Sequence, residues 1–304
     1  MFGTLMLLCD LSRAGVRALE WAAGLAALFG SRLTIVHVIE WSPEKGDAGA
    51  SEKVELQIRA ELSAAVEKTA PELVDEVISR TRIEVLEGRP AVTLLGAIGR
   101  DAPDLVVMGT AGLSDLPHVL MGSVAEKVVR HSPSPVLVTR KTSAWPPRSV
   151  LLPVDFSGPV DETFALAEAL AGTLPVRFSL VHVITPVPPT ARVPSLPPGD
   201  LMDGLAPREK DALERLEALQ ASHPKLDTDS FLLEGPAADQ ICQSARDSKT
   251  DLILIPTHSR SGLERFLMGG VAEQVVRYAP CAVLSHCPKA AVPYRSRLIR
   301  PEAS

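Results

Sequence analysis

Residues 104–138 read DLVVMGTAGLSDLPHVLMGSVAEKVVRHSPSPVLV, and this stretch decides the fold. It opens with a short apolar run at 105–108 that is rich in β-branched residues, which predicts a strand buried on both faces. Glycines follow at positions 109, 112 and 122, and the residues from 123 onward have helical periodicity. A strand, a glycine-containing loop and a helix in this order are typical of an anion site.

The start of the predicted helix has the chemistry that an anion needs. A helix N-terminus carries unpaired backbone N–H groups and about half a positive charge, so Gly122 and Ser123 can receive phosphate oxygens. Gly109 and Gly112 can supply the positive φ angles that fold a loop back over a ligand. An alternative needs no ligand, because Ser123 and Glu126 are spaced as a capping box that would close the helix start internally.

The spacing G-x2-G-x9-G-[ST] resembles the nucleotide-binding signature of the universal stress protein family. All four positions match, at Gly109, Gly112, Gly122 and Ser123. The segment AEKVVRHSPSPVLV resembles that family's fourth helix and fifth strand, and LCDLS at residues 8–12 resembles its first strand-to-helix turn. The resemblance implies ATP, bound with Mg²⁺, as the ligand.

The resemblance also assigns individual site residues. They are Leu8, Cys9, Asp10 and Val38 around adenine, Met108, Gly109 and Gly112 beside the ribose and phosphates, and Gly122, Ser123 and Val124 at the phosphate tail. The sequence departs from the usual family pattern at Leu8 and Cys9, which are bulkier or more reactive than common choices, and at Ala111, where many members carry histidine. Asp10 has an alternative structural interpretation, because an aspartate in front of a helix can cap it.

An internal repeat organises the rest of the chain. LTIVHVIE at residues 33–40 matches FSLVHVIT at 178–185, and VAEKVVR at 124–130 matches VAEQVVR at 271–277. Two copies of one domain are therefore joined head to tail. The predicted domains are residues 1–141 and 148–288, followed by a tail at 289–304, and the prolines of the KTSAWPPRS segment mark the join because they interrupt both helix and strand.

Each copy has the same order of predicted elements. In the first copy they are strands at 3–9, 32–39, 81–87 and 135–140, helices at 13–29, 51–69 and 90–101, and the glycine-containing unit already described. Strands that alternate with helices predict an α/β fold with a parallel, doubly wound sheet and helices on both faces. The family resemblance implies five strands in the order 3-2-1-4-5, with the ligand cleft where strands 1 and 4 part.

The second copy does not keep the nucleotide signature. The four equivalent positions hold Pro256, Ser259, Gly269 and Gly270, so a single signature glycine is retained. Pro256 fixes φ at about −65° and cannot imitate a glycine with positive φ, and Gly270 lacks the serine hydroxyl. We therefore expect weak nucleotide binding or none in this copy, although PVDFS at 153–157 preserves the first turn and leaves a different small ligand open.

Two further segments distinguish the second copy. Residues 185–200 are rich in proline and predict an irregular surface loop, with cover of a cleft or contact with a partner as the alternative. Residues 205–222 predict a helix with alternating acidic and basic side chains, which indicates a solvated face.

Composition excludes several classes of protein. The 304 residues are 46% hydrophobic and 22% charged, which suits globular domains. No apolar run approaches the roughly 20 residues of a membrane-spanning helix, and the first residues have no basic leader, so we expect a cytoplasmic protein with no membrane contact. A net charge of −6 and a pI near 5.7 argue against a nucleic-acid partner.

The cysteines indicate neither a disulfide framework nor a metal site. Cys9, Cys242, Cys281 and Cys287 are few and scattered for a chain of this size, which fits a reducing compartment. Cys281, His286 and Cys287 form the one local cluster, but they are fewer than the ligands of a closed zinc site.

Three functional hypotheses follow. The leading one is a tandem universal stress protein whose first domain binds ATP as a regulatory ligand. An enzyme, a slow ATPase or phosphotransferase, is the second, although the chain has no P-loop or kinase motif. His37, His118 and His131 are interpreted as strand-end, loop and helix-end residues rather than bases. The third is an interaction scaffold. The apolar strands at 135–140 and 281–286 resemble the family's dimerising edge, so we expect the two copies to pair there as a pseudo-twofold, with a homodimer of chains as a further assembly.

Overall fold

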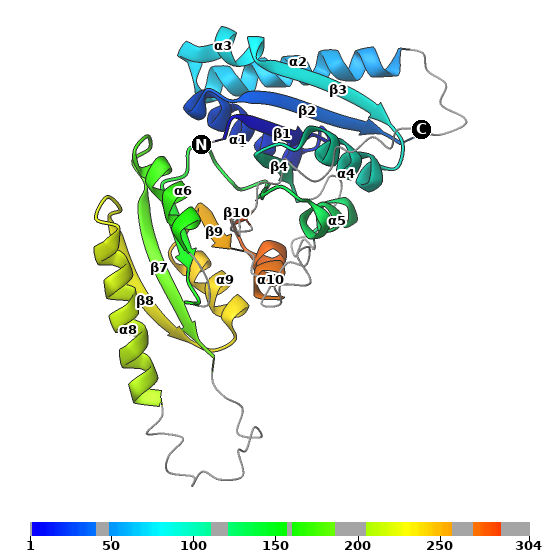
Figure 1. Cartoon of the computed structure of the whole chain (residues 1–304). Coiled ribbons are helices and arrows are strands. Elements are labelled where there is room, and N and C mark those ends of the chain that lie inside the picture. Colours follow the sequence, from blue (N-terminus) through cyan, green and yellow to red (C-terminus); the bar gives the residue numbers. More distant parts are fainter. Residues whose placement is uncertain are drawn as a thin grey trace, which may run out of the picture.

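Ten strands form one continuous sheet that passes through both copies of the repeat (Figure 1). The computed structural model describes residues 2–40, 49–110, 121–156, 160–185, 205–256 and 270–286. The proline-rich segment at 186–204, the tail from residue 287 and the loops at 111–120 and 257–269 lie outside the described residues.

The first copy contains every element that its sequence predicts. In chain order these are β1 (Thr4–Leu8), α1 (Arg13–Phe29), β2 (Arg32–Ile39), α2 (Ala50–Thr69), β3 (Thr81–Glu87), α4 (Pro90–Asp101), β4 (Leu105–Gly109), α5 (Ser123–His131) and β5 (Val136–Thr139). The ends of the predicted elements differ from these bounds by no more than one residue. A 3₁₀ turn at Pro71–Leu73 and α3 (Val74–Ser79) were not predicted, since a segment this short shows no clear periodicity.

The second copy repeats this order. Its described elements are β6 (Ser149–Pro153), α6 (Asp161–Ala171), β7 (Arg177–Ile184), α8 (Leu205–Ser222), β8 (Thr228–Glu234), α9 (Ala237–Asp247), β9 (Leu252–Pro256), α10 (Gly270–Tyr278) and β10 (Ala282–His286).

The sheet has the strand order β3-β2-β1-β4-β5-β10-β9-β6-β7-β8. Neighbouring strands are parallel within each copy, which confirms two doubly wound halves of order 3-2-1-4-5. The halves meet where β5 and β10 pair antiparallel, with Val138 opposite Val283 and Leu137 opposite Leu284. The predicted pairing of the two copies through their last strands is therefore confirmed.

Alternate side chains of each strand enter different cores. Leu5 and Leu7 of β1 face the core that α1 and α2 cover, whereas Met6 and Leu8 face the core that α4 and α5 cover. All four are at least 95% buried, as a strand covered on both faces requires. The Leu8 face of the sheet therefore borders α5 at the carboxyl end of β1, whereas the opposite face borders α2.

The join between the copies is anchored on α1. The indole of Trp145 packs edge-to-face on Trp21, with ring centroids 5.3 Å apart at 73°. Gly24, one turn further along α1, has no side chain, and a Cβ at this position would collide with the Trp145 indole. The predicted proline-containing linker is thus a packed segment of the first copy.

Helices α5 and α10 face each other beside the junction and exchange charges. Arg130 of α5 contacts Glu273 of α10 at 2.5 Å, and Arg277 of α10 contacts Glu126 of α5 at 2.9 Å. We call these four residues the interdomain charge quartet. In the internal repeat Arg130 corresponds to Arg277, and Glu126 corresponds to Glu273. The two ion pairs are therefore related by the pseudo-twofold of the chain.

A buried cation, Arg140, crosses the junction, and cysteine occupies its repeat position in the sequence. Arg140 follows β5 and is 9% exposed, and its Nη2 donates to the carbonyls of Val276 (2.5 Å) and Arg277 (3.2 Å) in the last turn of α10. A cation is well placed there, because unpaired carbonyls give a helix C-terminus partial negative charge. Burial lowers the pKa of the Arg140 guanidinium from its ordinary value.

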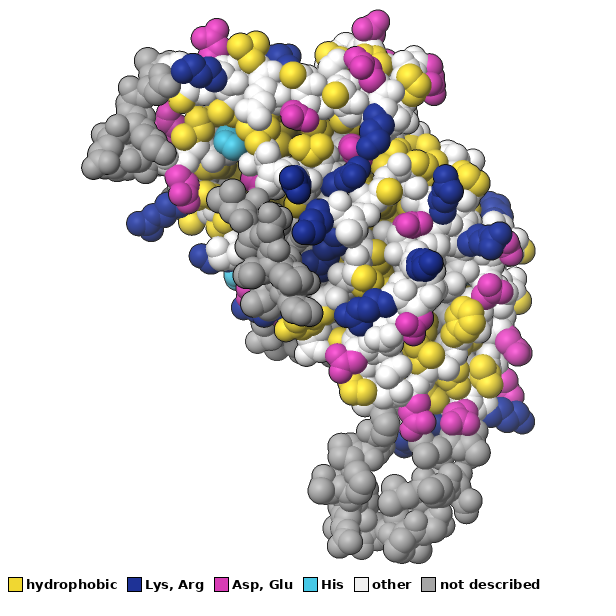
Figure 2. All heavy atoms as spheres, turned by 180° about the vertical axis from the view of Figure 1, so that it is seen from behind, with side chains coloured by type: hydrophobic (Ala, Val, Ile, Leu, Met, Phe, Trp, Pro, Cys, Tyr) yellow, Lys and Arg dark blue, Asp and Glu magenta, His cyan; other side chains and the backbone are white. Residues whose placement is uncertain are grey.

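None of the helices in the described ranges is both long and apolar enough to cross a membrane. Acidic and basic side chains are both spread over the face seen in Figure 2, among exposed hydrophobic and polar ones.

Candidate nucleotide site

The turn after β1 carries the first predicted site residues. Asp10 is exposed, and its Oδ1 accepts hydrogen bonds from the Ser12 N–H (3.0 Å) and the Ser12 hydroxyl (2.6 Å). Ser12 Oγ in turn accepts from the Gly15 N–H at 3.1 Å and so caps α1. The interpretation of Asp10 as the helix cap is therefore wrong, because Asp10 orients the residue that caps. Asp10 Oδ2 makes no hydrogen bond to the described part of the chain.

Both copies build this turn around a residue with left-handed backbone geometry. Leu11 has φ 58° and Phe156, its counterpart, has φ 55°, a conformation that costs a residue with a Cβ about 1 kcal/mol. A histidine from the next strand supports the turn, because His37 Nδ1 donates to the Cys9 carbonyl at 2.8 Å. His182 makes the same contact in the second copy. His37 is thus a strand-end residue with a structural contact, as its sequence position indicates.

Cys9 lies beneath the turn rather than on its open side. Its side chain is 7% exposed and belongs to the α1–α2 core, and its N–H donates to the Val36 carbonyl at 2.9 Å. Burial raises the pKa of the Cys9 thiol to about 11, so the thiol is protonated at neutral pH. Since the thiolate is the reactive form of cysteine, burial disfavours reactions of this thiol.

The carboxyl end of β4 is joined directly to the start of α5. Gly122 N–H donates to the Thr110 carbonyl at 2.8 Å, and Thr110 N–H donates to the Thr139 carbonyl of β5 at 3.1 Å. These two bonds place the α5 N-terminus at the edge of the sheet where β1 and β4 end. Thr110 was not a predicted site residue, and its position directly after Gly109 was the signal that could have identified it.

Gly109 allows close packing rather than a positive φ angle. A Cβ on Gly109 would lie 2.8 Å from the backbone carbonyl carbon and oxygen of Ala14, so β4 can approach α1 this closely only with glycine at its end. The φ angle of Gly109 is outside the left-handed region, as is that of Gly122 at −60°. The predicted role of Gly109 as a source of positive φ is therefore wrong. Gly112 and Ala111 lie outside the described residues.

Helix α5 begins without a side-chain cap. Gly122 is the N-cap residue, Ser123 is the first helical residue, and no side chain among the described residues caps the first turn. The capping-box alternative is therefore wrong, since it requires Ser123 at the N-cap with Glu126 three residues on. Ser123 is exposed, and the first backbone N–H groups of α5 have no side-chain cap from the part of the chain that the structure describes.

The apolar residues of the predicted site share one face of the sheet. Leu8 and Met108 are adjacent on β1 and β4 and are each 5% exposed in the α4–α5 core. Val38 and Val124 are half-buried and pack against the same core from β2 and α5. Four residues from four elements therefore form one apolar wall beside the α5 N-terminus.

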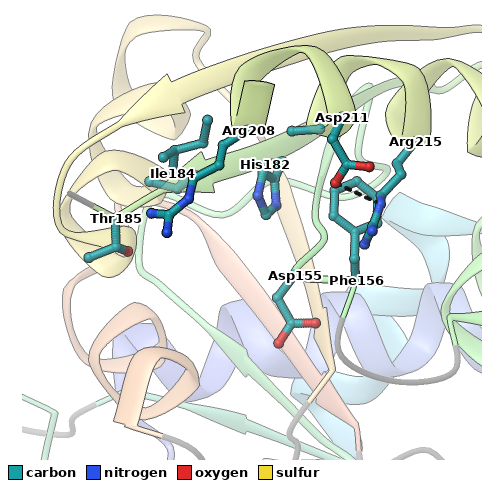
Figure 3. Close-up of a pocket in the computed structure, with 10 residues that line it drawn as sticks. Asp155, Phe156, His182, Ile184, Thr185, Arg208, Asp211 and Arg215 are labelled. Carbon is teal, nitrogen blue, oxygen red and sulfur yellow. Dashed lines mark ion pairs between the residues drawn. The ribbon is translucent and has the colours of Figure 1, made fainter. Parts of the chain in front are cut away.

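The second copy keeps the turn but has different chemistry around it. A cavity of about 440 Å³ lies where β6 and β7 end and is bordered by α8 (Figure 3). Arg208 and Arg215 of α8 line it, and both side chains are exposed, in agreement with the solvated charged face predicted for this helix. The two arginines are seven residues apart and thus lie on one helix face, a spacing that could have indicated a shared site.

Within the described ranges, no three histidine, cysteine or acidic side chains gather in an arrangement that could hold a metal ion. Cys242 and Cys281 are buried free thiols, and burial raises the pKa of Cys281 to about 12. Cys287, part of the cluster seen in the sequence, lies outside the described residues.

These features define a class of protein: a tandem α/β chain with an anion-type strand, glycine and helix unit at the switch point of one half. The family follows from comparison with known proteins. The model of the universal stress protein family matches residues 1–140 and 147–285, and the chain belongs to that family as a tandem, two-domain member.

Relatives with one domain and relatives with two domains both support this assignment. A universal stress protein of Thermus aquaticus is 36% identical over 140 residues, which are 46% of this chain and 100% of the relative. A universal stress protein of Mycobacterium tuberculosis is 28% identical over 275 residues, which are 87% of this chain and 90% of the relative. The first relative thus matches one copy, and the second spans both.

Solved structures show the same fold. A universal stress protein from Archaeoglobus fulgidus superposes with a TM-score of 0.60 at 19% identity, covering 94% of this chain and 99% of that one. A functionally unknown protein from Pseudomonas aeruginosa gives a TM-score of 0.64 at 18% identity, with coverage of 94% and 93%.

Proposed function

We propose that this chain is a regulatory protein of the stress response that binds ATP with Mg²⁺ in its first copy. The observation that carries the proposal is the uncapped N-terminus of α5, tied to the end of β4 through Thr110 and Gly122. Backbone N–H groups at such a helix start bind phosphate oxygens well. The family is commonly nucleotide-binding, which agrees with this chemistry.

The residues around this helix start fit the parts of a nucleotide. Gly122, Ser123 and Val124 would hold the phosphates through backbone N–H groups and the Ser123 hydroxyl. Leu8, Val38 and Met108 supply an apolar wall for adenine, and Asp10 Oδ2, which no described residue contacts by a hydrogen bond, is an acceptor at its rim. Cys9 supports the turn from below, while Gly109 and Gly112 border the ribose and phosphates.

ATP acts in this proposal as a ligand that is bound and not turned over. His37 is engaged with the Cys9 carbonyl, and His131 is in the last turn of α5, at the opposite end of that helix from Ser123. His118 lies outside the described residues. The described histidines therefore supply no base beside the phosphates.

The second copy serves in this proposal as the packing partner of the first. Pro256 ends β9 without an N–H group, and Gly270 begins α10 without a hydroxyl. We assign the domains to residues 1–141 and 148–288, with the tail at 289–304, and expect a cytoplasmic protein. Because β5 and β10 are already paired, a homodimer of chains would need another surface, such as the outer strands β3 and β8.

The test is isothermal titration of the nucleotide-stripped full chain with Mg-ATP, with stoichiometry recorded. We expect one ATP per chain, and we expect the double variant Gly122→Val with Ser123→Leu to lower affinity at least about tenfold, because it covers the helix start with apolar groups.

The matched control is Gly270→Leu. Gly270 is the first residue of α10, as Ser123 is of α5, and a Cβ there meets no atom of the described residues within 4 Å. This variant should bind ATP as the unaltered chain does. Unchanged binding by the double variant, two ATP molecules per chain, or no binding at all would each contradict the proposal.

A further inference from the structure

The cavity of the second copy has the position and the lining of a candidate ligand site. The cavity opens at the carboxyl ends of β6 and β7 and has a volume of about 440 Å³ (Figure 3). Sites for small molecules commonly have volumes of roughly 300–1,000 Å³ and occur at this edge of doubly wound sheets. The side chains that line it come from the turn after β6, the end of β7 and one face of α8.

One wall of the cavity is aromatic. Phe156 is half-buried and its left-handed backbone directs the ring toward His182, with ring centroids 4.7 Å apart at 42°. The Arg215 guanidinium carbon lies 5.8 Å from the Phe156 ring centroid on the α8 side. Ile184 adds an aliphatic surface at the end of β7. A flat, apolar ligand group can stack on this wall.

The imidazole of His182 presents a defined atom to the cavity. Its Nδ1 contacts the Val154 carbonyl at 2.7 Å, and a carbonyl oxygen can only accept, so Nδ1 carries a proton. In the neutral ring Nε2 is then the acceptor, and in the charged ring it is a second donor. Figure 3 shows His182 and Arg208 directed into one space.

The positive charge of the cavity is concentrated on Arg208. Arg215 is paired with Asp211, whose Oδ2 is 3.1 Å from the Arg215 Nε. Arg208 is exposed, lines the cavity and has no ion pair with any residue that the structure describes. Since the carboxylates of Asp155 and Asp211 also line the cavity, a ligand with a single negative charge suits it better than a polyphosphate.

The first copy lacks this arrangement. The buried pair Ile58 and Leu62 on α2 corresponds to Ala212 and Leu216 on α8. In that register Val54 stands in place of Arg208, and Glu61 in place of Arg215. Leu11 stands in place of Phe156, so the ring is also absent. The cavity chemistry therefore belongs to the second copy alone.

We propose that the second copy binds a small aromatic carboxylate, with its ring on Phe156 and its carboxylate on the Arg208 guanidinium. Arg208 offers several N–H donors in one plane, which suits the two oxygens of a carboxylate. The site is distinct from the nucleotide site of the first copy, and the two ligands bind independently.

The experiment is titration of the full chain with 1-naphthoate, and with the neutral, similarly shaped 1-naphthamide as comparison. We expect one naphthoate per chain and weaker binding of the amide. Arg208→Gln should lower naphthoate affinity about tenfold, the ratio expected when a hydrogen bond between charged groups is lost. Lys210→Gln is the matched control, because Lys210 is on the same helix but outside the cavity, and it should leave the affinity unchanged.

A second variant tests the aromatic wall without risk to the turn. Phe156→Leu places at this position the residue that already adopts φ 58° in the first copy, and it should also weaken naphthoate about tenfold. The proposal is overturned if naphthoate does not bind, if Arg208→Gln binds it unchanged, or if the amide binds equally well. It is also overturned if ATP displaces naphthoate. Naphthoate affinity that persists in the Gly122→Val, Ser123→Leu variant supports it and separates it from the proposed function.

Discussion

Asp104 and Asp251 hold the first and fourth strands of each copy together at their amino ends. Asp104 Oδ2 accepts from the N–H groups of Gly3 (2.9 Å) and Thr4 (3.0 Å), and Asp251 Oδ2 accepts from those of Arg148 (2.8 Å) and Ser149 (3.0 Å). The two aspartates occupy equivalent positions of the internal repeat, 147 residues apart, as Gly122 and Gly269 do. Their role was not predictable, because each partner is about a hundred residues away in sequence.

At the same scale, the sequence identified the residue types of the candidate site more reliably than their roles. Gly109 and Ser123 were singled out by spacing, and both lie at the predicted edge of the sheet. The need for glycine at position 109 arises from the backbone of Ala14 on another element, and the cap of α5 depends on which residue precedes its first turn. Neither is determined by local sequence.

The buried thiol of Cys9 should make stability depend on alkaline pH. The thiol ionises at its ordinary value of 9.0 in the unfolded chain and at about 11 in the folded one. Unfolding therefore releases a proton once the pH exceeds 9, and stability falls as the pH rises from there to 11. At pH 10 the loss from this thiol is about 1.4 kcal/mol.

Urea denaturation at pH 7 and pH 10 measures this effect when the chain is compared with Cys9→Ala. The variant should lose about 1.4 kcal/mol less between the two pH values. Equal losses would show that Cys9 is not the group responsible.

Among the elements, the linker is the one whose structure differs most from its sequence signal. Its prolines indicated a break between domains, which is correct, but Trp145 packs against Trp21 and above Gly24. We expect Gly24→Ala to destabilise the chain by about 1–3 kcal/mol, because the new methyl group would displace the indole. Thermal or urea unfolding checks this.

Two further variants separate this contact from a general effect on helices. Gly96→Ala adds the same methyl group to α4 where nothing lies within 4 Å, and it should be neutral or stabilising by about 0.5–1 kcal/mol. Adding Trp145→Ala to Gly24→Ala should cost less than the sum of the two single changes. Strict additivity of the two would argue against the contact.

Long, strongly periodic elements were predictable, whereas short ones and helix faces were less so. Helix α1 was located to the residue, since its apolar positions recur with helical spacing over 17 residues. The turn and short helix at 71–79 were missed, because segments this short show no clear periodicity in sequence. Helix α8 was predicted, but its charges gave no indication of which ones border a cavity until β7 was in place.

For the whole molecule, the sheet order was predictable because parallel strands linked by helices permit few arrangements. The pairing of the two last strands at the junction was predictable from the sequence, but the ion pairs beside it were not. The interdomain charge quartet became visible only once α5 and α10 lay beside each other.

Charge reversal tests the quartet. Arg130→Glu places three carboxylates together and should destabilise the chain by about 1 kcal/mol, a modest value because the residues are partly exposed. Adding Glu273→Arg makes α5 acidic and α10 basic at this contact and should recover at least half of the loss. Urea unfolding at low and high salt measures both, and the differences should shrink with salt. A double variant no more stable than Arg130→Glu would mean that the quartet contributes nothing to the junction.

The antiparallel contact of β5 with β10 joins two copies that are encoded separately within one chain. In a homodimer of identical subunits, any substitution appears twice, and both sites change together. Here a substitution appears once. One domain can therefore change in sequence while the other keeps its chemistry. Because the two domains are covalently joined, they remain in a one-to-one ratio at any dilution.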